Sequence, residues 1–200
     1  MHDDDSTPDG APPHPAADND DDGHLIETTI SSRDVYRGQL LHVKSDRVRL
    51  PDGSEATREY IVHPGAAMII PILPDGRLLM ERQYRYPLQR VMLEFPAGKL
   101  DPGEDMLKTA QRELMEETGY RAEHWEWLAE VHPIISYTTE RIEIFLATGL
   151  TLERAKLDAG EFLETVVVDF ADAFARMKAG KITDVKTIIG LYQLRDRGFG

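Results

Sequence analysis

The feature that most constrains this chain of 200 residues is the segment 98–120, which reads GKLDPGEDMLKTAQRELMEETGY. A loop with two glycines leads into a stretch where Glu113, Glu116 and Glu117 stand at positions i, i+3 and i+4. In an α-helix this spacing places all three carboxylates on one face. Carboxylates this close repel one another unless a cation neutralises them, and oxygen ligands suit Mg²⁺ or Mn²⁺. The segment therefore predicts a loop and a short helix with a divalent metal site at its far end.

Composition is consistent with a soluble, cytoplasmic protein rather than a secreted or membrane protein. A hydrophobic content of 41% is enough for one sizeable core, or for one domain plus an accessory sheet. There is no cysteine, so neither disulfides nor thiol chemistry can contribute. No apolar run approaches the ~18 residues that span a membrane, and the first residues lack the pattern of a signal peptide.

The net charge of −13 is concentrated at the amino terminus. Residues 1–24 contain eight aspartates and no lysine or arginine, so the remainder of the chain carries about −5. With four prolines in the same stretch, residues 1–24 are predicted to form a disordered, solubilising tail. Such a tail would repel phosphates, which argues against nucleic-acid binding.

Short alternating runs between residues 27 and 62 predict a small antiparallel β segment. Its expected strands include residues 40–43 and 47–50, followed by a turn at Pro51-Asp52-Gly53. The apolar run 66–73 and the segment 77–84 flank a second turn, and they are expected to pair as a hairpin.

The rest of the chain predicts strands that follow the acidic helix and two closing helices. The expected strands are 125–132, 141–150 and 162–168, and the expected helices are 170–179 and 184–197. Gly180 would stop the first of these helices, and Thr183 or Asp184 would cap the second. This order predicts an α+β fold, a sandwich of helices flanking a mixed sheet.

The segment 98–120 resembles the signature of the Nudix hydrolases, which cleave nucleoside diphosphates linked to another moiety. Every fixed position of that signature is present, with Tyr120 as an acceptable bulky final residue. An exposed acidic helix would require neither the two glycines nor Arg112. The resemblance implies a Nudix-type α/β/α sandwich at 65–200, preceded by the tail at 1–24 and a dimerising β segment at 25–64.

Three further segments resemble the ADP-ribose diphosphatases within this family: 81–86 (ERQYRY), 94–98 (EFPAG) and 133–141 (PIISYTTER). The resemblance implies Mg²⁺-dependent hydrolysis of ADP-ribose to AMP and ribose 5-phosphate. One departure is Ser136, which stands where many relatives have glycine, and it leaves the substrate open.

The resemblance also implies roles for individual residues. Metal ions would be held by Glu113, Glu117 and the carbonyl of Ala97, with Glu116 bridging them or acting from outside the ligand set. Glu140, on a mobile loop, would be the general base or a further metal ligand, so the catalytic set is Glu116, Glu117 and Glu140.

Other positions would support this site. Gly98 belongs to the motif loop, and an ion pair between Arg112 and Glu104 would orient the carboxylates. Arg85 would contact a substrate phosphate, and Arg58 the adenosine half. For both arginines, a surface salt bridge is the alternative reading.

A weaker expectation places Lys99 at the terminal ribose. His63 and His132 each precede a proline and are assigned structural roles. Trp125 and Trp127 share one face of a strand and are expected in the core, which leaves Tyr36 or a partner-chain aromatic to stack on adenine.

The expected partners are a small nucleoside diphosphate sugar and a second copy of the chain, with no nucleic acid and no membrane. The segment 25–64 is too small to bury a core of its own, so a homodimer is expected. Three alternatives differ in function. One is hydrolysis of another nucleotide sugar such as GDP-mannose. The second is removal of damaged dNTPs, and the third is a non-catalytic ADP-ribose sensor. Intact motif glutamates disfavour the sensor.

Overall fold

In the computed structural model, which describes residues 22–153 and 162–199, the chain divides into two compact units. The first contains the described residues up to Arg33 together with Ser45–Arg58. The second contains Asp34–Lys44 and the described residues from Glu59 onward. Most of the predicted acidic tail lies outside the described residues, and Asp22–Leu25 form a short 3-10 helix, η1.

The amino-terminal strands form a three-stranded sheet in the order β1-β2-β3. The strands are β1 (Thr28–Arg37), β2 (His42–Arg49) and β3 (Glu55–Val62). The two strands expected at 40–43 and 47–50 are therefore parts of the single strand β2. The predicted turn is present, and Gly53 adopts φ +85°, which a glycine tolerates without steric cost.

A mixed four-stranded sheet in the order β7-β4-β10-β9 forms the centre of the second unit. Strand β4 (Ala66–Pro71) runs parallel to β10 (Ile142–Thr148) and antiparallel to β7 (Ala97–Lys99). Strand β9 (His124–Val131) pairs antiparallel with β10. The mixed sheet expected from the sequence is thus confirmed.

A second, three-stranded sheet has the order β12-β5-β6, formed by Leu163–Val168, Leu78–Arg85 and Arg90–Glu94. The hairpin expected between 66–73 and 77–84 is reduced to one antiparallel bridge, between Ile72 and Leu78, because β4 and β5 continue into different sheets. Strand β4 pairs with β10 on one edge and, over Ala66–Met68, with β7 on the other. A two-stranded ladder joins β8 (Tyr120–Arg121) and β11 (Thr151–Leu152).

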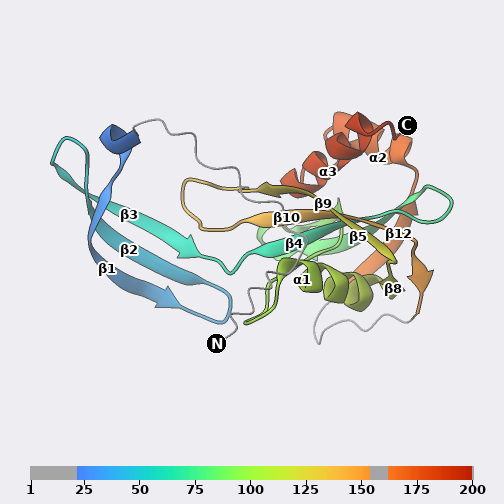
Figure 1. The fold of residues 1–200 in the computed structure, drawn as a ribbon, viewed down its shortest axis with the longest axis horizontal. Coiled ribbons are helices and arrows are strands. Elements are labelled where there is room, and N and C mark those ends of the chain that lie inside the picture. Colours follow the sequence, from blue (N-terminus) through green and yellow to red (C-terminus); the bar gives the residue numbers. More distant parts are fainter. Residues whose placement is uncertain (1–21, 154–161, 200) are drawn as a thin grey trace, which may run out of the picture. The chain divides into compact units, whose positions relative to one another are not determined.

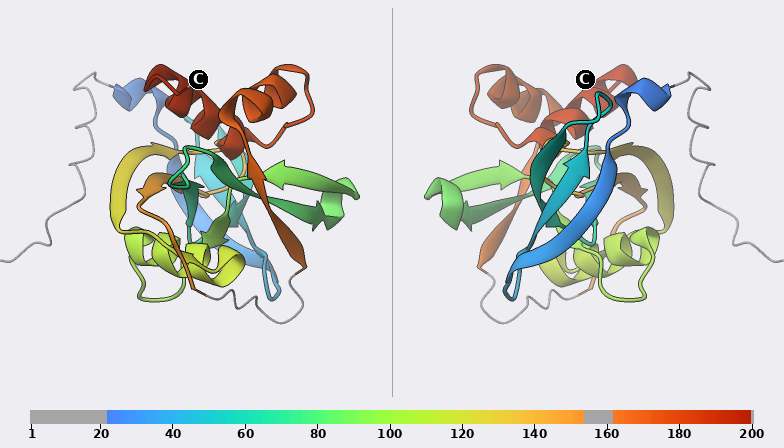
Figure 2. Two further views of the ribbon diagram at one scale, coloured as in Figure 1. Left: turned by 90° about the vertical axis from the view of Figure 1, so that its right-hand side faces the viewer. Right: turned by 90° about the vertical axis from the view of Figure 1, so that its left-hand side faces the viewer.

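Alternate side chains of β4 divide the core into two clusters, as the period of a strand requires. Met68 and Ile70 pack with residues of α2 (Phe170–Lys178) and α3 (Val185–Asp196). Ala67 and Ile69 pack with residues of α1 (Met106–Glu113). Figure 1 shows α1 on one side of β4 and β10 and the other two helices on the opposite side, and both views of Figure 2 agree. This is the expected α/β/α sandwich.

The closing helices begin and end close to the predicted residues. Asp184 caps α3, and its carboxylate accepts a hydrogen bond from the Thr187 backbone N–H (3.0 Å). Gly180 follows α2 with φ +71°. Trp125 and Trp127 both pack against the cluster under α1, in agreement with the core role expected for them.

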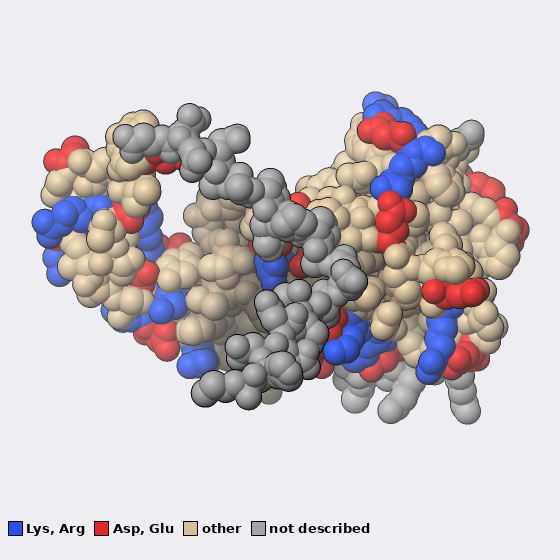
Figure 3. Space-filling model, viewed as in Figure 1, with Lys and Arg blue, Asp and Glu red and all other residues tan. Residues whose placement is uncertain are grey.

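Charges of both signs are intermixed over the face of the second unit that Figure 3 presents. Exposed ion pairs of this unit include Arg176–Asp172 (2.9 Å) and Arg197–Glu126 (2.8 Å). Such pairs each add little to stability because solvent screens them. No helix within the described residues is long and apolar enough to cross a membrane.

Candidate active site

The acidic segment is a short α-helix that widens into a π-helical turn. Helix α1 begins at Asp105, whose carboxylate accepts the Lys108 N–H (2.9 Å), and it is followed by the π-helix η3 (Leu114–Thr118). The expectation of one regular α-helical face is therefore wrong after Glu113, because a π-turn contains more residues per turn. Glu117 is buried at 5% exposure, whereas the Glu116 side chain is 30% exposed.

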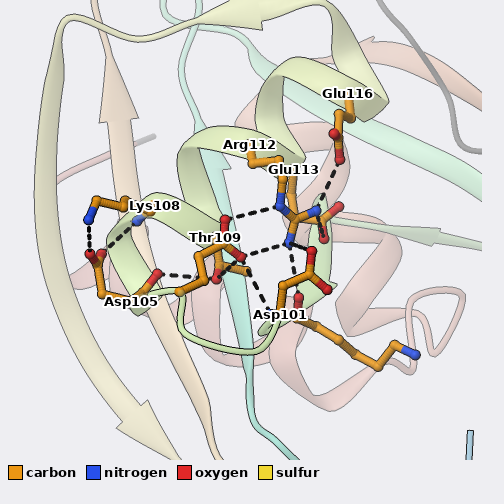
Figure 4. A network of polar contacts seen from close by, with 9 residues as sticks. Asp101, Asp105, Lys108, Thr109, Arg112, Glu113 and Glu116 are labelled. Atoms are coloured by element: carbon orange, nitrogen blue, oxygen red, sulfur yellow. Dashed lines mark hydrogen bonds and ion pairs between the residues drawn. The ribbon is translucent and has the colours of Figure 1, made fainter.

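Arg112 is the centre of a network of four carboxylates (Figure 4): it forms hydrogen bonds to three of them and lies 3.9 Å from Oδ2 of Asp101. Its Nη1 donates to Oε1 of Glu113 (2.8 Å) and to Oε2 of Glu116 (3.0 Å). Its Nε and Nη2 donate to the two oxygens of Glu104 at 3.1 and 3.0 Å. Nη2 also donates to the carbonyl of Lys99 (3.1 Å), which ties α1 to β7.

This network holds more negative than positive charge. The Arg112 guanidinium and the Thr109 hydroxyl lower the pKa of Glu104, whose partial burial opposes them. Glu104 in turn raises the pKa of Arg112 well above its ordinary value, with smaller contributions from Glu113 and Glu116. Four carboxylates surround one guanidinium, so negative charge exceeds positive charge around Arg112, which favours an added cation.

Gly98 provides the space that the Glu113 carboxylate occupies. A Cβ atom at residue 98 would lie 1.8 Å from both Cδ and Oε1 of Glu113. Any side chain there would displace the carboxylate, since contacts below 3.0 Å are repulsive. The glycine of the motif loop therefore allows Glu113 to lie against the backbone of β7, next to Ala97.

A cleft of about 250 Å³ opens in the second unit beside β7. It is lined by five of the residues predicted for the site and by others from β4, β10, α3 and the loops around them. The predicted residues are Arg85, Ala97, Gly98, Lys99 and Glu140. The others are His63, Ala66, Pro133, Ile142, Asp184, Val185 and Lys186. The three motif glutamates do not line the cleft itself, and Glu113 reaches it only through its contact with Gly98.

Three residues of the cleft, Arg85, Asp184 and Lys186, belong to a network of alternating charges around a buried carboxylate, Glu94. Glu94, at 3% exposure, accepts two hydrogen bonds from Arg85 (2.8 and 2.9 Å) and one from Lys186 Nζ (2.6 Å). Lys186 also pairs with Asp184 at 3.0 Å. Burial raises the pKa of Glu94, but Arg85 and Lys186 together outweigh it and leave the pKa lowered.

Sequence reasoning missed Glu94 and Lys186 as site residues. The two residues are 92 positions apart, and no local pattern links them. The available signal was an acidic residue directly before the Phe95-Pro96 step, with a lysine in the first turn of the last helix.

His63 faces Glu140 across the cleft, with 3.9 Å between Nε2 of the ring and Oε1 of the carboxylate. Burial lowers the pKa of the His63 imidazole, an effect that Glu140 opposes and Lys99 reinforces. A position in the wall of the cleft was not foreseen for this residue, whereas His132 is half exposed and lies 3.8 Å from Glu130.

Arg58, predicted at the adenosine half, belongs to the first unit. Its Nε donates to Oε2 of Glu27 at 2.9 Å, so it forms the surface ion pair that was the alternative interpretation. It is not among the residues that line the cleft. Its substrate role stays a prediction.

The chemistry of the acidic residues fits a hard divalent cation, because carboxylate and carbonyl oxygens are the ligands that Mg²⁺ and Mn²⁺ take. Within residues 22–153 and 162–199, no three His, Asp or Glu side chains lie close enough together to hold an ion. Arg112 separates Glu113 from Glu116 by binding both.

Two domain models match this chain. The NUDIX domain model matches residues 62–187, and the nucleoside diphosphate sugar hydrolase N-terminal domain matches residues 27–61. A methanol dehydrogenase activator of Bacillus methanolicus is 37% identical over 171 residues, which cover 84% of this chain and 92% of that protein. An ADP-ribose pyrophosphatase of Bacillus subtilis is 34% identical over 173 residues, covering 86% and 94% of the two chains.

The fold of this chain is also similar to a solved structure, the crystal structure of an ADP compounds hydrolase. It matches with a TM-score of 0.78 and 27% identity, covering 88% of this chain and 98% of that one. The family model alone spans more than half of the chain, and it includes the acidic motif, the cleft residues from His63 onward and the start of α3. The chain belongs to the Nudix family.

Proposed function

We propose that this protein hydrolyses ADP-ribose, with a divalent cation, to AMP and ribose 5-phosphate. In this reaction water attacks one phosphorus of the pyrophosphate, the bridging P–O bond breaks, and a phosphate leaves with the bridging oxygen. The observation that carries the proposal is the acidic motif: its carboxylates outnumber its cations, and Gly98 connects it to a cleft that also contains Arg85 and Glu140. The similarity to an ADP-ribose pyrophosphatase supports the choice of substrate.

The metal would be Mg²⁺, held by Glu113, Glu117 and the carbonyl of Ala97, with Glu116 and Glu140 as further candidates. When bound, it neutralises phosphate oxygens and makes water a better nucleophile at neutral pH. The protein itself supplies position and charge. Gly98 fixes where Glu113 can lie, and Arg112 holds Glu113 and Glu116 in place through hydrogen bonds.

Residues of the cleft would orient the substrate and accept the proton. Arg85 presents a cation held by Glu94, and a guanidinium of this kind suits a phosphate oxygen. Glu140 would accept a proton from the attacking water, or add a ligand to the metal. Lys99 lines the same cleft and would contact the terminal ribose.

The test is Mg²⁺-dependent hydrolysis of ADP-ribose, GDP-mannose, UDP-glucose, NADH and 8-oxo-dGTP by the wild type and two variants. Glu117→Gln removes a buried motif carboxylate. Glu123→Gln removes a carboxylate whose side chain is 75% exposed and serves as the control. We expect rapid release of AMP and ribose 5-phosphate by the wild type and the control, and none by Glu117→Gln.

Other outcomes would change the proposed function. Faster turnover of GDP-mannose would keep the proposed chemistry and change the substrate. The chain is also similar to a GDP-mannose pyrophosphatase of Yersinia enterocolitica. Tight binding of ADP-ribose without turnover of any compound would indicate a sensor. Equal activity of Glu117→Gln and the wild type would overturn the motif chemistry.

We also propose that the chain acts in the cytoplasm as a homodimer through residues 25–64. All ten residues of β1 are exposed, among them Ile30, Val35 and Tyr36. Exposed apolar side chains in a strand at the edge of a sheet favour pairing with another chain. Light scattering should give twice the chain mass for the wild type and the monomer mass for Val35→Lys. The matched control is Val167→Lys, at an exposed valine of β12 outside residues 25–64, which should keep the mass of the dimer.

A further inference from the structure

The segment that leads into Glu140 is bound to the end of strand β3. The Ile61 N–H donates to the carbonyl of Tyr137, and the Thr139 N–H donates to the carbonyl of Ile61, both at 2.9 Å. These bonds make a parallel bridge between Ile61 and Thr138. Residues 137–139 therefore form a short parallel extension of β3.

The Thr139 hydroxyl adds a second connection at the next residue pair. Its oxygen accepts a hydrogen bond from the His63 N–H (2.9 Å), and the hydroxyl donates to the carbonyl of His63 (3.4 Å). One hydroxyl thus satisfies both backbone polar groups of His63. On the other side, the Glu140 N–H donates to the hydroxyl of Thr138 (3.0 Å), which fixes the backbone of the glutamate itself.

The His63 ring extends this arrangement to the Glu140 carboxylate. Its Nδ1 accepts a hydrogen bond from the Gly65 N–H at 3.1 Å, so the proton of the neutral ring lies on Nε2. Nε2 in turn faces Oε1 of Glu140 at 3.9 Å. Both side chains are largely buried, at 16% and 27% exposure, and both line the cleft.

We propose that His63 and Thr139 are positioning residues that hold the Glu140 carboxylate at the cleft. Thr139 fixes the backbone of His63 against the loop, Gly65 orients the ring, and the Nε2–H side of the ring limits where the carboxylate can turn. The proposal has two parts. The mechanical part, that Thr139 and β3 order the loop at 137–139, does not depend on the proposed function. The kinetic part, that this order raises the rate of hydrolysis, rests on the proposed function of Glu140.

The mechanical part is tested by hydrogen–deuterium exchange of the amides in 137–141 and 61–63. Thr139→Val keeps the shape of the side chain and removes the hydroxyl, and Thr139→Ser restores the hydroxyl. We expect exchange to become at least about tenfold faster in Thr139→Val and to return toward wild type in Thr139→Ser. Unchanged exchange in Thr139→Val would overturn the proposal, whatever the substrate proves to be.

The kinetic part is tested with His63→Gln on whichever nucleoside diphosphate compound the wild type hydrolyses. The matched control is His132→Gln, another histidine before a proline, which does not line the cleft. We expect kcat of His63→Gln to fall about tenfold or more with KM and Tm nearly unchanged, because a small misplacement of a reacting group is costly. The control should keep the kcat of the wild type.

The outcomes separate the proposal from the proposed function. If Glu140→Gln abolishes turnover while His63→Gln and Thr139→Val keep the wild-type kcat, Glu140 acts without these residues and the proposal fails. If the wild type turns over no compound, the proposed function fails, and the exchange experiment still decides whether Thr139 orders the loop. A Thr139→Ser variant that recovers both kcat and slow exchange supports the proposal.

Discussion

Two networks of charged side chains lie beside the same cleft, and they differ in how their charge is balanced. Around Glu94, two cations and two carboxylates compensate one another, and the central carboxylate is 3% exposed. Around Arg112, a single cation pairs with four carboxylates, and its side chain is 26% exposed.

This difference in charge balance indicates that the Glu94 network has a structural role and that the Arg112 network can take up a cation. A buried charge that is fully paired resists change, since removing one partner leaves a desolvated charge behind. A network with excess negative charge and access to solvent gains by taking up a cation. The Glu94 network therefore shapes the wall of the cleft, and the Arg112 network supplies the chemistry.

The largest effect should come from placing a methyl group between the motif and the cleft. In Gly98→Ala, the new Cβ would coincide with the Glu113 carboxylate and displace it. We expect hydrolysis to fall about a hundredfold, because reacting groups must be placed to within ~1 Å. Gly76→Ala is the control: Gly76 has φ +86° and open space around it, so about 1 kcal/mol of stability is lost and activity is kept. Near-normal activity of Gly98→Ala would contradict the role given to Gly98.

The balanced network should lose stability when one cation is removed. Lys186→Met leaves Glu94 with Arg85 alone, and we expect the free energy of unfolding in urea to fall by about 2 kcal/mol. Lys108→Met, at an exposed pair with Asp105, should change it by less than about 0.5 kcal/mol. Similar small losses in both variants would show that the Glu94 network is no scaffold.

The network around Arg112, which has excess negative charge, should instead gain thermal stability when a metal ion binds. Arg112→Met should lower the free energy of unfolding by about 1 kcal/mol in EDTA, since three carboxylates lose a shared donor. Mg²⁺ should then raise the Tm of this variant more than that of the wild type, because a cation replaces the missing charge. The Tm of Lys186→Met should not show this extra gain. Equal metal responses in all three proteins would remove the distinction between the networks.

The smallest effect should be on the pH dependence of Tm in the Glu104→Gln variant, between pH 6 and pH 3. The folded-state pKa of Glu104 lies below its unfolded value of about 4.3. Its contribution to stability is therefore complete above that value and is lost as the pH falls through the folded pKa. A Tm profile from pH 6 to pH 3 should fall less steeply for Glu104→Gln than for the wild type. Parallel profiles would contradict the lowered pKa.

Much of the fold could be predicted because its signals are local. The two closing helices follow apolar periodicity and an Asp184 cap, and the buried strands follow apolar runs bounded by turns. The β4–β5 pairing was overestimated for the same reason: a turn between two apolar runs signals a reversal of the chain, but it carries no information about which sheet each strand joins.

The site was predicted where one segment supplies it and missed where distant segments meet. Glu113 and Arg112 follow from the spacing of the motif. The partners of Glu94 and of Glu140 are 92 and 77 positions away, at Lys186 and His63, and nothing local marks them. The wall of the cleft is a product of tertiary structure.

The π-turn at 114–118 has a consequence for anyone who would transplant this motif. The letters of the sequence record only how far apart the glutamates are along the chain, and a uniform helix would satisfy the same letters. On an idealised α-helical scaffold the segment would keep every residue, but Glu116 and Glu117 would point in other directions than they do in the π-turn. A faithful graft must therefore carry the wide turn, together with the Gly119 that closes it at φ +76°.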